Sequence, residues 1–129
     1  YAAGDLIEQR EVFYGIWPAS ERQGEPAGIN MAGGSAMYEG TTISNMLKVA
    51  GIDLAAAGDI DADGKNEAII HKDRENYVYR KLVIKDNILS GCILYGDITG
   101  YQRILKSIGA KRNISDIRIN LEKRDLSAL

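Results

Sequence analysis

Three aspartates at alternate positions form the motif in this sequence that most resembles a binding site. Asp59, Asp61 and Asp63 are followed by Gly64, which matches positions 1, 3, 5 and 6 of an EF-hand calcium loop. Position 12 of that loop needs a bidentate glutamate, and the chain has Ile70 there, in a strand-like run. Aspartates between two strands commonly bond their own backbone in a turn. We therefore expect a hairpin turn, and a calcium-stabilised module is the weakest of the functional hypotheses.

The single cysteine and the single histidine are the other reactive side chains. Cys92 lies in a predicted strand between apolar neighbours, which favours a small buried hydrophobe over a reactive thiol. His71 ends an apolar pair before charged residues, which indicates a solvated strand end. No nucleophile, base and orienting group can be assembled from local spacing, and no Cys/His cluster could hold zinc. We expect no catalytic residue and no metal ligand, and the lone cysteine suggests a reducing, cytoplasmic setting.

Composition limits the partners. The 129 residues are 45% hydrophobic and 26% charged, which is typical of one folded domain, with or without an appendage. A formal charge of -2 gives the chain no reason to bind nucleic acid. No apolar run approaches the roughly 20 residues that span a bilayer, so no membrane partner is expected.

Basic side chains are concentrated at the C-terminal end. Residues 100–129 carry seven Lys and Arg against three carboxylates, whereas the preceding part is acidic. Such a patch could orient an acidic protein partner, although scattered basic residues on a helix often do no more than solvate it. The candidate docking residues are Arg103, Lys106, Lys111, Arg112 and Arg118.

A helix is predicted over residues 16–32 in the glycine-rich N-terminal part. Pro18 suits its first turn, whereas Pro26 would lie inside it and predicts a kink or a break. The glycine pair Gly33-Gly34 is the expected domain boundary, dividing the chain into 1–34 and 35–129.

The remaining elements predict an α+β domain, a small antiparallel sheet with helices on one side. In the fourth predicted strand, Tyr77, Tyr79, Lys81 and Val83 alternate with a mostly apolar set that contains Val78, Arg80, Leu82 and Ile84. Apolar spacing then predicts a helix from Tyr101 to Ile108, capped by Asp97 or Thr99 and stopped by Gly109. A shorter helix is predicted over 114–121, capped by Asn113 or Ser115. The predicted strands are 46–50, 53–58, 67–72, 76–84 and 89–95.

Several separated motifs resemble one family. They are residues 1–5 (YAAGD), 14–19 (YGIWPA), 23–24 (QG), 27–34 (AGINMAGG), 47–54 (LKVAGIDL), 79–86 (YRKLVIKD) and 94–97 (LYGD). In order and spacing they resemble the end of the FAD domain and the small C-terminal domain of FAD-dependent pyridine nucleotide-disulfide oxidoreductases, especially NADH-rubredoxin reductases and nitrite reductase large subunits. The resemblance runs from Tyr1 to about Leu121.

The resemblance implies roles for the first part of the chain. Residues 1–34 would be a remnant of the FAD-binding domain, a strand end and a helix. Asp5 matches the aspartate that hydrogen-bonds the ribityl chain of FAD, and a carboxylate can accept from such a hydroxyl. Trp17, Pro18 and Ala19 match the helix start that faces the flavin, where the helix dipole would stabilise negative charge on the reduced ring.

The glycine-rich loops for FAD and NAD(P)H and any redox cysteines of such enzymes would lie upstream of Tyr1. The resemblance therefore implies a C-terminal fragment that neither holds FAD firmly nor turns over by itself. Its parent would move hydride from NAD(P)H to FAD and electrons to an acceptor such as rubredoxin. Residues 35–129 would be an interface or acceptor-facing domain, and residues 16–32 could pair two copies into a homodimer. The alternative is a self-contained module that docks an acidic partner through its basic C-terminal helices.

Overall fold

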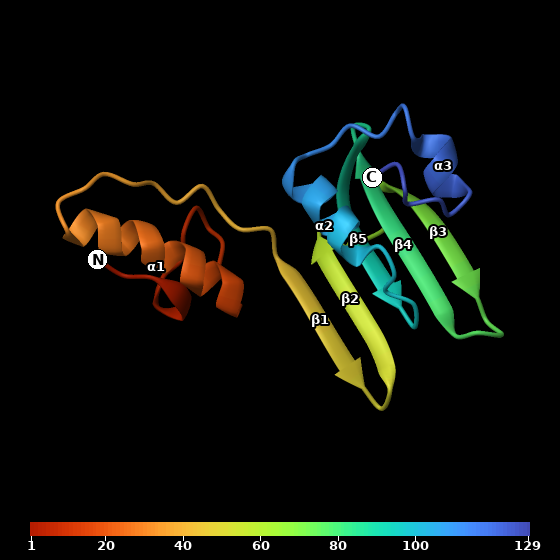
Figure 1. Ribbon diagram of the computed structural model, residues 1–129, viewed down its shortest axis with the longest axis horizontal. Coiled ribbons are helices and arrows are strands. Elements are labelled where there is room, and N and C mark those ends of the chain that lie inside the picture. The colour runs from red at the N-terminus through yellow and green to blue at the C-terminus, as the bar shows by residue number, and fades with distance from the viewer. The chain divides into compact units, whose positions relative to one another are not determined.

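The computed structural model describes residues 1–129 and divides into two compact units, Tyr1–Ile43 and Ser44–Leu129 (Figure 1). The division lies later in the chain than Gly33-Gly34, because residues after the glycines hydrogen-bond back to the first unit. The Asn30 side chain donates to the Ala36 carbonyl at 3.0 Å and accepts from its N–H at 2.8 Å. The Gln9 side chain donates to the Tyr38 carbonyl at 3.2 Å. Residues 34–43 therefore belong with the helix that precedes them.

The first unit contains a short 3-10 helix, η1 (Gly4–Leu6), and one α-helix, α1 (Trp17–Met31). The strand end expected ahead of the helix is represented only by an isolated bridge between Gln9 and Val12. The two helices contact each other through a hydrogen bond from the Gly4 N–H to the buried Gln23 side chain, at 2.7 Å. This bond ties the N-terminal segment to α1.

Helix α1 has a proline in its first turn, as predicted, and continues through a second one. Pro18 occupies the first turn, while Pro26 lies in the interior and the helix runs on to Met31. Of the kink or break predicted at Pro26, the break is therefore wrong. Pro26 removes one hydrogen bond to the carbonyl of Arg22, but Arg22 is exposed, so water can solvate that carbonyl and limit the cost.

The second unit is built on one five-stranded antiparallel sheet with the order β1-β2-β5-β4-β3. All five predicted strands are present, with ends displaced by at most two residues. Their bounds are Ser44–Val49 for β1, Ile52–Gly58 for β2, Glu67–Asp73 for β3, Val78–Lys85 for β4 and Ile88–Tyr95 for β5.

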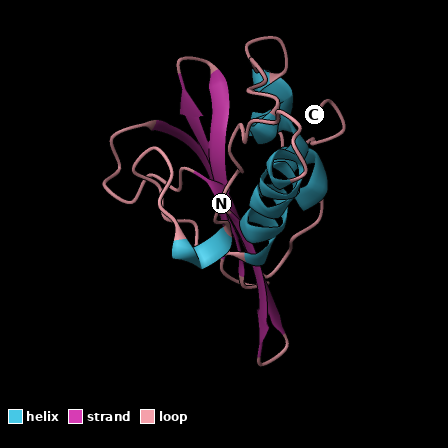
Figure 2. Ribbon diagram, turned by 90° about the vertical axis from the view of Figure 1, so that its left-hand side faces the viewer, coloured by secondary structure: helices cyan, strands magenta, loops and turns pink.

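Two helices, α2 (Tyr101–Gly109) and α3 (Arg118–Glu122), lie on the same side of this sheet (Figures 1 and 2). The hydrophobic core forms between them and the sheet, and it includes Leu82, Leu94, Ile104 and Leu121. The alternation in β4 and the helical spacing after Tyr101 both predict this core, so the α+β fold with helices on one side is confirmed.

The helix caps differ from the prediction. Gly100, in the left-handed conformation, precedes α2 and no side chain caps that helix, because the Asp97 carboxylate accepts from the Thr99 N–H at 2.8 Å instead. Asn113 likewise accepts from the Ser115 N–H at 3.0 Å and forms a turn, so α3 starts only at Arg118. In both places the side chain bonds a backbone N–H two residues ahead, which makes an Asx turn in front of the helix.

A close backbone contact holds the end of β2 against β5. The Asp59 N–H donates to the Ser90 carbonyl at 3.0 Å, and a Cβ atom on the buried Gly91 would overlap the Asp59 carbonyl oxygen. Glycine is therefore needed at position 91 for the aspartate loop to begin at this place.

Candidate functional site

An internal cation occupies the aspartate loop. The Lys81 ammonium donates to the carbonyl oxygens of Ile60 and Asp61, each at 2.9 Å, and approaches the Asp61 carboxylate at 3.3 Å. Both side chains are largely buried, with 12% of Lys81 and 3% of Asp61 exposed. Lys81 thus supplies, from strand β4, the positive charge that calcium supplies in an EF-hand loop.

The Asp59 and Asp61 carboxylates also accept hydrogen bonds from backbone N–H groups of the loop itself. The Asp61 carboxylate accepts from the N–H groups of Lys65 at 2.8 Å and Asn66 at 3.0 Å, and Asp59 accepts from the Asp61 N–H at 2.8 Å. Burial alone would raise the pKa of Asp61. The hydrogen bonds from Asn66, Lys65 and Lys81 together lower it by a larger amount, so the pKa of Asp61 lies below its usual value. The predicted turn, with aspartates that bond their own backbone, is present, but the predicted hairpin is wrong, because the loop joins β2 and β3, which are not neighbours in the sheet. The chain contains no group of three or more His, Cys, Asp or Glu side chains placed to hold one metal ion.

Cys92 belongs to the core, as predicted. Its side chain is fully buried in β5, and burial raises the pKa of the thiol to about 11, so the nucleophilic thiolate is scarce at neutral pH. His71 is half-buried in β3 and lies opposite Arg80 in the strand register. Neither side chain has the partner that a nucleophilic mechanism requires.

The first unit brings together the residues that the family resemblance relates to FAD. Asp5 is exposed on η1, which α1 holds through the bond between Gly4 and Gln23. Gly4 has a φ of +77°, and a Cβ atom there would lie 3.0 Å from the Ser20 hydroxyl of α1. Asp5 is thus attached to the same helix whose first turn contains Trp17, Pro18 and Ala19.

The start of α1 offers fewer N–H donors than an ordinary helix. Pro18 has none, and the N–H of the buried Ala19 already donates to the Ile16 carbonyl at 3.1 Å. Trp17 is 81% exposed and its N–H has no acceptor within the chain. Of the three residues, Trp17 alone therefore keeps a backbone donor for a ligand.

The basic C-terminal residues lie on α2, on the segment that follows it and on α3. Arg103 lies in the first turn of α2, while Lys106, Lys111 and Arg112 are near its C-terminal end and make no ion pair. Arg118 is already committed, because its guanidinium pairs with Glu67 of β3 and with Glu122 at 3.2 Å. The docking hypothesis is thus left with the three cations at the end of α2.

Two contacts are not predicted by the sequence patterns described above. Lys81 closes the aspartate loop from a strand 20 residues away, and no local spacing indicates this. Arg80 was visible as an arginine on the apolar face of its strand, next to Leu82, and a charge in that position requires a partner.

The fold and its relatives define the class of protein. A five-stranded antiparallel sheet with a few helices is the fold of the C-terminal domains of FAD-dependent pyridine nucleotide-disulfide oxidoreductases. The crystal structure of NADH:rubredoxin oxidoreductase from Clostridium acetobutylicum matches 92% of this chain and 31% of that one, with a TM-score of 0.65 and 26% identity. A NAD-dependent persulfide reductase from A. fulgidus has a TM-score of 0.72 over 91% of this chain at 22% identity, which shows the shared fold.

Residues 44–112 match the family described as the Rubredoxin NAD+ reductase C-terminal domain. This match spans more than half of the chain, and the chain belongs to that family. The matched region starts at Ser44, the first residue of the second unit.

Curated relatives extend the likeness to both units. The chain is 31% identical over 117 residues to a nitrite reductase [NAD(P)H] of Bacillus subtilis, which covers 90% of this chain and 14% of the relative. It is 29% identical over 121 residues to the NADH-rubredoxin oxidoreductase of Clostridium acetobutylicum, covering 91% of this chain and 30% of the relative. The chain thus spans less than a third of the length of these relatives, which are multidomain oxidoreductases. None of the helices has both the length and the apolar character that crossing a membrane requires.

Proposed function

We propose that this chain is the C-terminal part of an FAD-dependent NAD(P)H oxidoreductase, and that its second unit serves as an interface or acceptor-facing domain. The family match over residues 44–112 carries the proposal. The parent would pass hydride from NAD(P)H to FAD and electrons to an acceptor such as rubredoxin. The absence of a catalytic arrangement around Cys92 and His71 supports a role in which the chemistry belongs to FAD and NAD domains of the same parent chain.

We further propose that the first unit contributes one edge of the FAD site. The Asp5 carboxylate would accept a hydrogen bond from the ribityl chain, and the positive end of α1 would face the flavin. The exposure of Asp5 and the free N–H of Trp17 support this role. Pro18 has no N–H, and the N–H of Ala19 is already bonded to Ile16. Their contribution would therefore be the shape and the dipole of the helix start.

A flavin-fluorescence titration of the 129-residue chain with FAD tests the proposal first. We expect no binding in the low micromolar range and no NAD(P)H oxidation, since a single edge of the site leaves most of FAD in water. In the parent enzyme, Asp5→Ala should weaken FAD binding whereas Glu8→Ala, an exposed carboxylate beyond η1, should not. Tight binding of FAD by this chain alone would contradict the proposal that the chain supplies only one edge of the FAD site.

A second candidate function is docking of an acidic protein. The three cations Lys106, Lys111 and Arg112 at the end of α2 favour it, because no intramolecular carboxylate pairs with them. Charge reversal at Lys111 and Arg112 in the parent should slow electron transfer to rubredoxin and leave flavin reduction by NAD(P)H intact. The matched control is Lys85→Glu, an exposed lysine at the end of β4. Equal effects of the control and the reversal would refute docking at this place.

We also propose a reducing, cytoplasmic setting, supported by the lone thiol of Cys92. Pairing of two copies through α1 is a further proposal, supported by the exposed Trp17, Ile29 and Met31. Light scattering over a range of concentrations tests it, and Trp17→Ser should shift any dimer toward monomer.

A further inference from the structure

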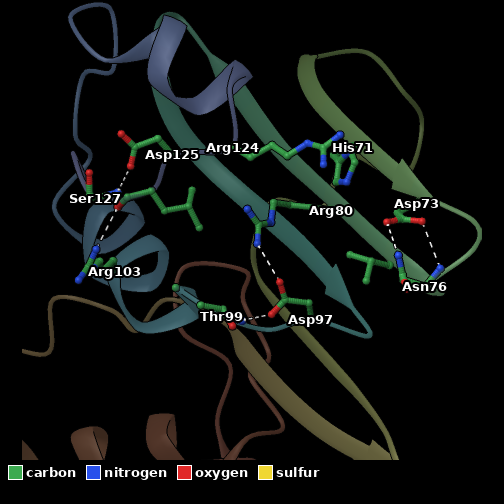
Figure 3. Close-up of a pocket in the computed structure, with 13 residues that line it drawn as sticks. His71, Asp73, Asn76, Arg80, Asp97, Thr99, Arg103, Arg124, Asp125 and Ser127 are labelled. Atoms are coloured by element: carbon green, nitrogen blue, oxygen red, sulfur yellow. Dashed lines mark hydrogen bonds and ion pairs between the residues drawn. The ribbon is translucent and has the colours of Figure 1, made fainter.

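A pocket of about 700 Å³ opens on the helix side of the sheet in the second unit (Figure 3). Strands β3 and β4, the start of α2 and the C-terminal residues form its walls. Arg80, Arg103 and Arg124 line it together with His71 and three aspartates, Asp73, Asp97 and Asp125. None of these residues belongs to the aspartate loop or to the first unit.

Arg80 is the unusual member of this group. Its side chain is only 11% exposed, and its Nε atom is buried with no hydrogen-bond partner. The guanidinium approaches one carboxylate, with Arg80 Nη2 lying 3.6 Å from Asp97 Oδ2, which is beyond ordinary hydrogen-bond length. A guanidinium has five donors, and leaving a buried one unsatisfied costs free energy. The Nε–H donor of Arg80 therefore has no acceptor within the chain.

Turn N–H groups orient the nearby carboxylates, and of the three only Asp97 lies within 4 Å of the Arg80 guanidinium. Asp97 accepts from the Thr99 N–H at 2.8 Å, and Asp125 accepts from the Ser127 N–H at 2.8 Å. Asp73 accepts from the backbone of the following turn, including the Asn76 N–H at 3.1 Å. These bonds hold the three aspartates at the turns of the pocket wall.

Other positive groups face the same space. The Arg124 side chain is exposed and makes no hydrogen bond or ion pair, and the Arg103 side chain makes one long hydrogen bond to the Leu126 carbonyl, at 3.5 Å. Helix α2 starts at the pocket with Gly100 as an uncapped N-terminus, and the Gln102 N–H has no acceptor. Helix N-termini favour bound anions.

We propose that this pocket binds a small-molecule oxyanion, with one carboxylate or phosphate group seated on the Arg80 guanidinium. Such a group would accept from the two Nη groups, the accessible end of a guanidinium whose Nε is buried, and arginine offers a two-pronged geometry there. The site lies outside the interface and flavin roles proposed above. A small molecule fits better than an acidic protein surface, because Arg80 is recessed and the outer aspartates, Asp73 and Asp125, would repel a broad acidic patch.

Inorganic phosphate is the first probe, titrated into the isotope-labelled 129-residue chain while the arginine Nε–H and backbone amide NMR signals are followed. We expect the Arg80 Nε–H and the amides of residues 99–103 to shift together. Arg80→Gln should weaken phosphate binding by about tenfold or more, the loss expected for one charge-assisted bidentate contact. Lys85→Gln, which removes one exposed charge from the end of the same strand, should change it less than about twofold.

Arg124→Gln keeps the proposal testable if Arg80→Gln does not fold, because Arg124 is exposed and its replacement leaves the core intact. It should weaken phosphate binding by about threefold. Succinate in place of phosphate distinguishes the two acceptor groups, and saturable binding of either one at Arg80 supports the proposal. Absence of binding by both would overturn it. Binding of a polyglutamate peptide alone would overturn it in favour of protein docking.

Discussion

The buried thiol of Cys92 permits a quantitative test that this domain contributes no redox-active cysteine. Burial raises its pKa to about 11. At pH 8 roughly 0.1% of such a thiol is ionised, against roughly a quarter of an ordinary cysteine with a pKa near 8.5. Since the thiolate is the reactive form, the pKa alone should slow labelling by about 200-fold. Exclusion of the reagent from the fully buried side chain slows it further.

Ellman's reagent measures this directly. The native chain should label over hours at pH 8, and the chain unfolded in guanidinium should label within seconds. The ratio of the two rates gives the protection of the thiol. Stoichiometric labelling of the native protein within a minute would refute the assignment of Cys92 to the core and would reopen a redox role.

The same shift predicts how stability depends on pH. Because the pKa is higher in the folded state than in the unfolded state, Cys92 contributes its full stabilisation below about pH 8.5 and loses it as the pH rises toward about 11. By pH 10 the free energy of unfolding should have fallen by roughly 2 kcal/mol from this group alone. Cys92→Ala should lack this part of the slope, and urea unfolding of both proteins between pH 8 and 10 separates it from other titrating groups. Parallel slopes would contradict the argument.

Three further changes test the loop and the helix. Lys81→Met should lower the thermal midpoint by several degrees, because it leaves the buried Asp61 carboxylate without its cation, whereas calcium or EDTA should not move the midpoint of the original chain; a calcium-dependent midpoint would contradict the internal-cation assignment. Pro26→Ala should restore a helical hydrogen bond and stabilise α1 by up to about 3 kcal/mol, seen as slower amide exchange in that helix. Gly91→Ala should prevent normal packing against Asp59 and abolish the dispersed NMR spectrum of the sheet, and an unchanged spectrum would show that the close contact is not required.

Several features of this protein follow from local sequence patterns. Alternation in residues 78–84 places Leu82 and Ile84 on one face, and the spacing of Tyr101, Ile104 and Ile108 builds the helix that covers that face. These predictions succeed because burial of apolar side chains at a regular period is a local property of the chain. The Asp59 turn could be predicted for a similar reason, since aspartate side chains bond backbone groups a few residues away.

Other features were decided only by tertiary structure. The cation of the aspartate loop comes from Lys81, and the Arg80 pocket draws on two strands, a helix start and the C-terminal residues. The physical reason is common to both cases. The electrostatic partner of a charged side chain depends on which segments lie close together in the folded chain. The periodicity of the sequence does not indicate which segments those are.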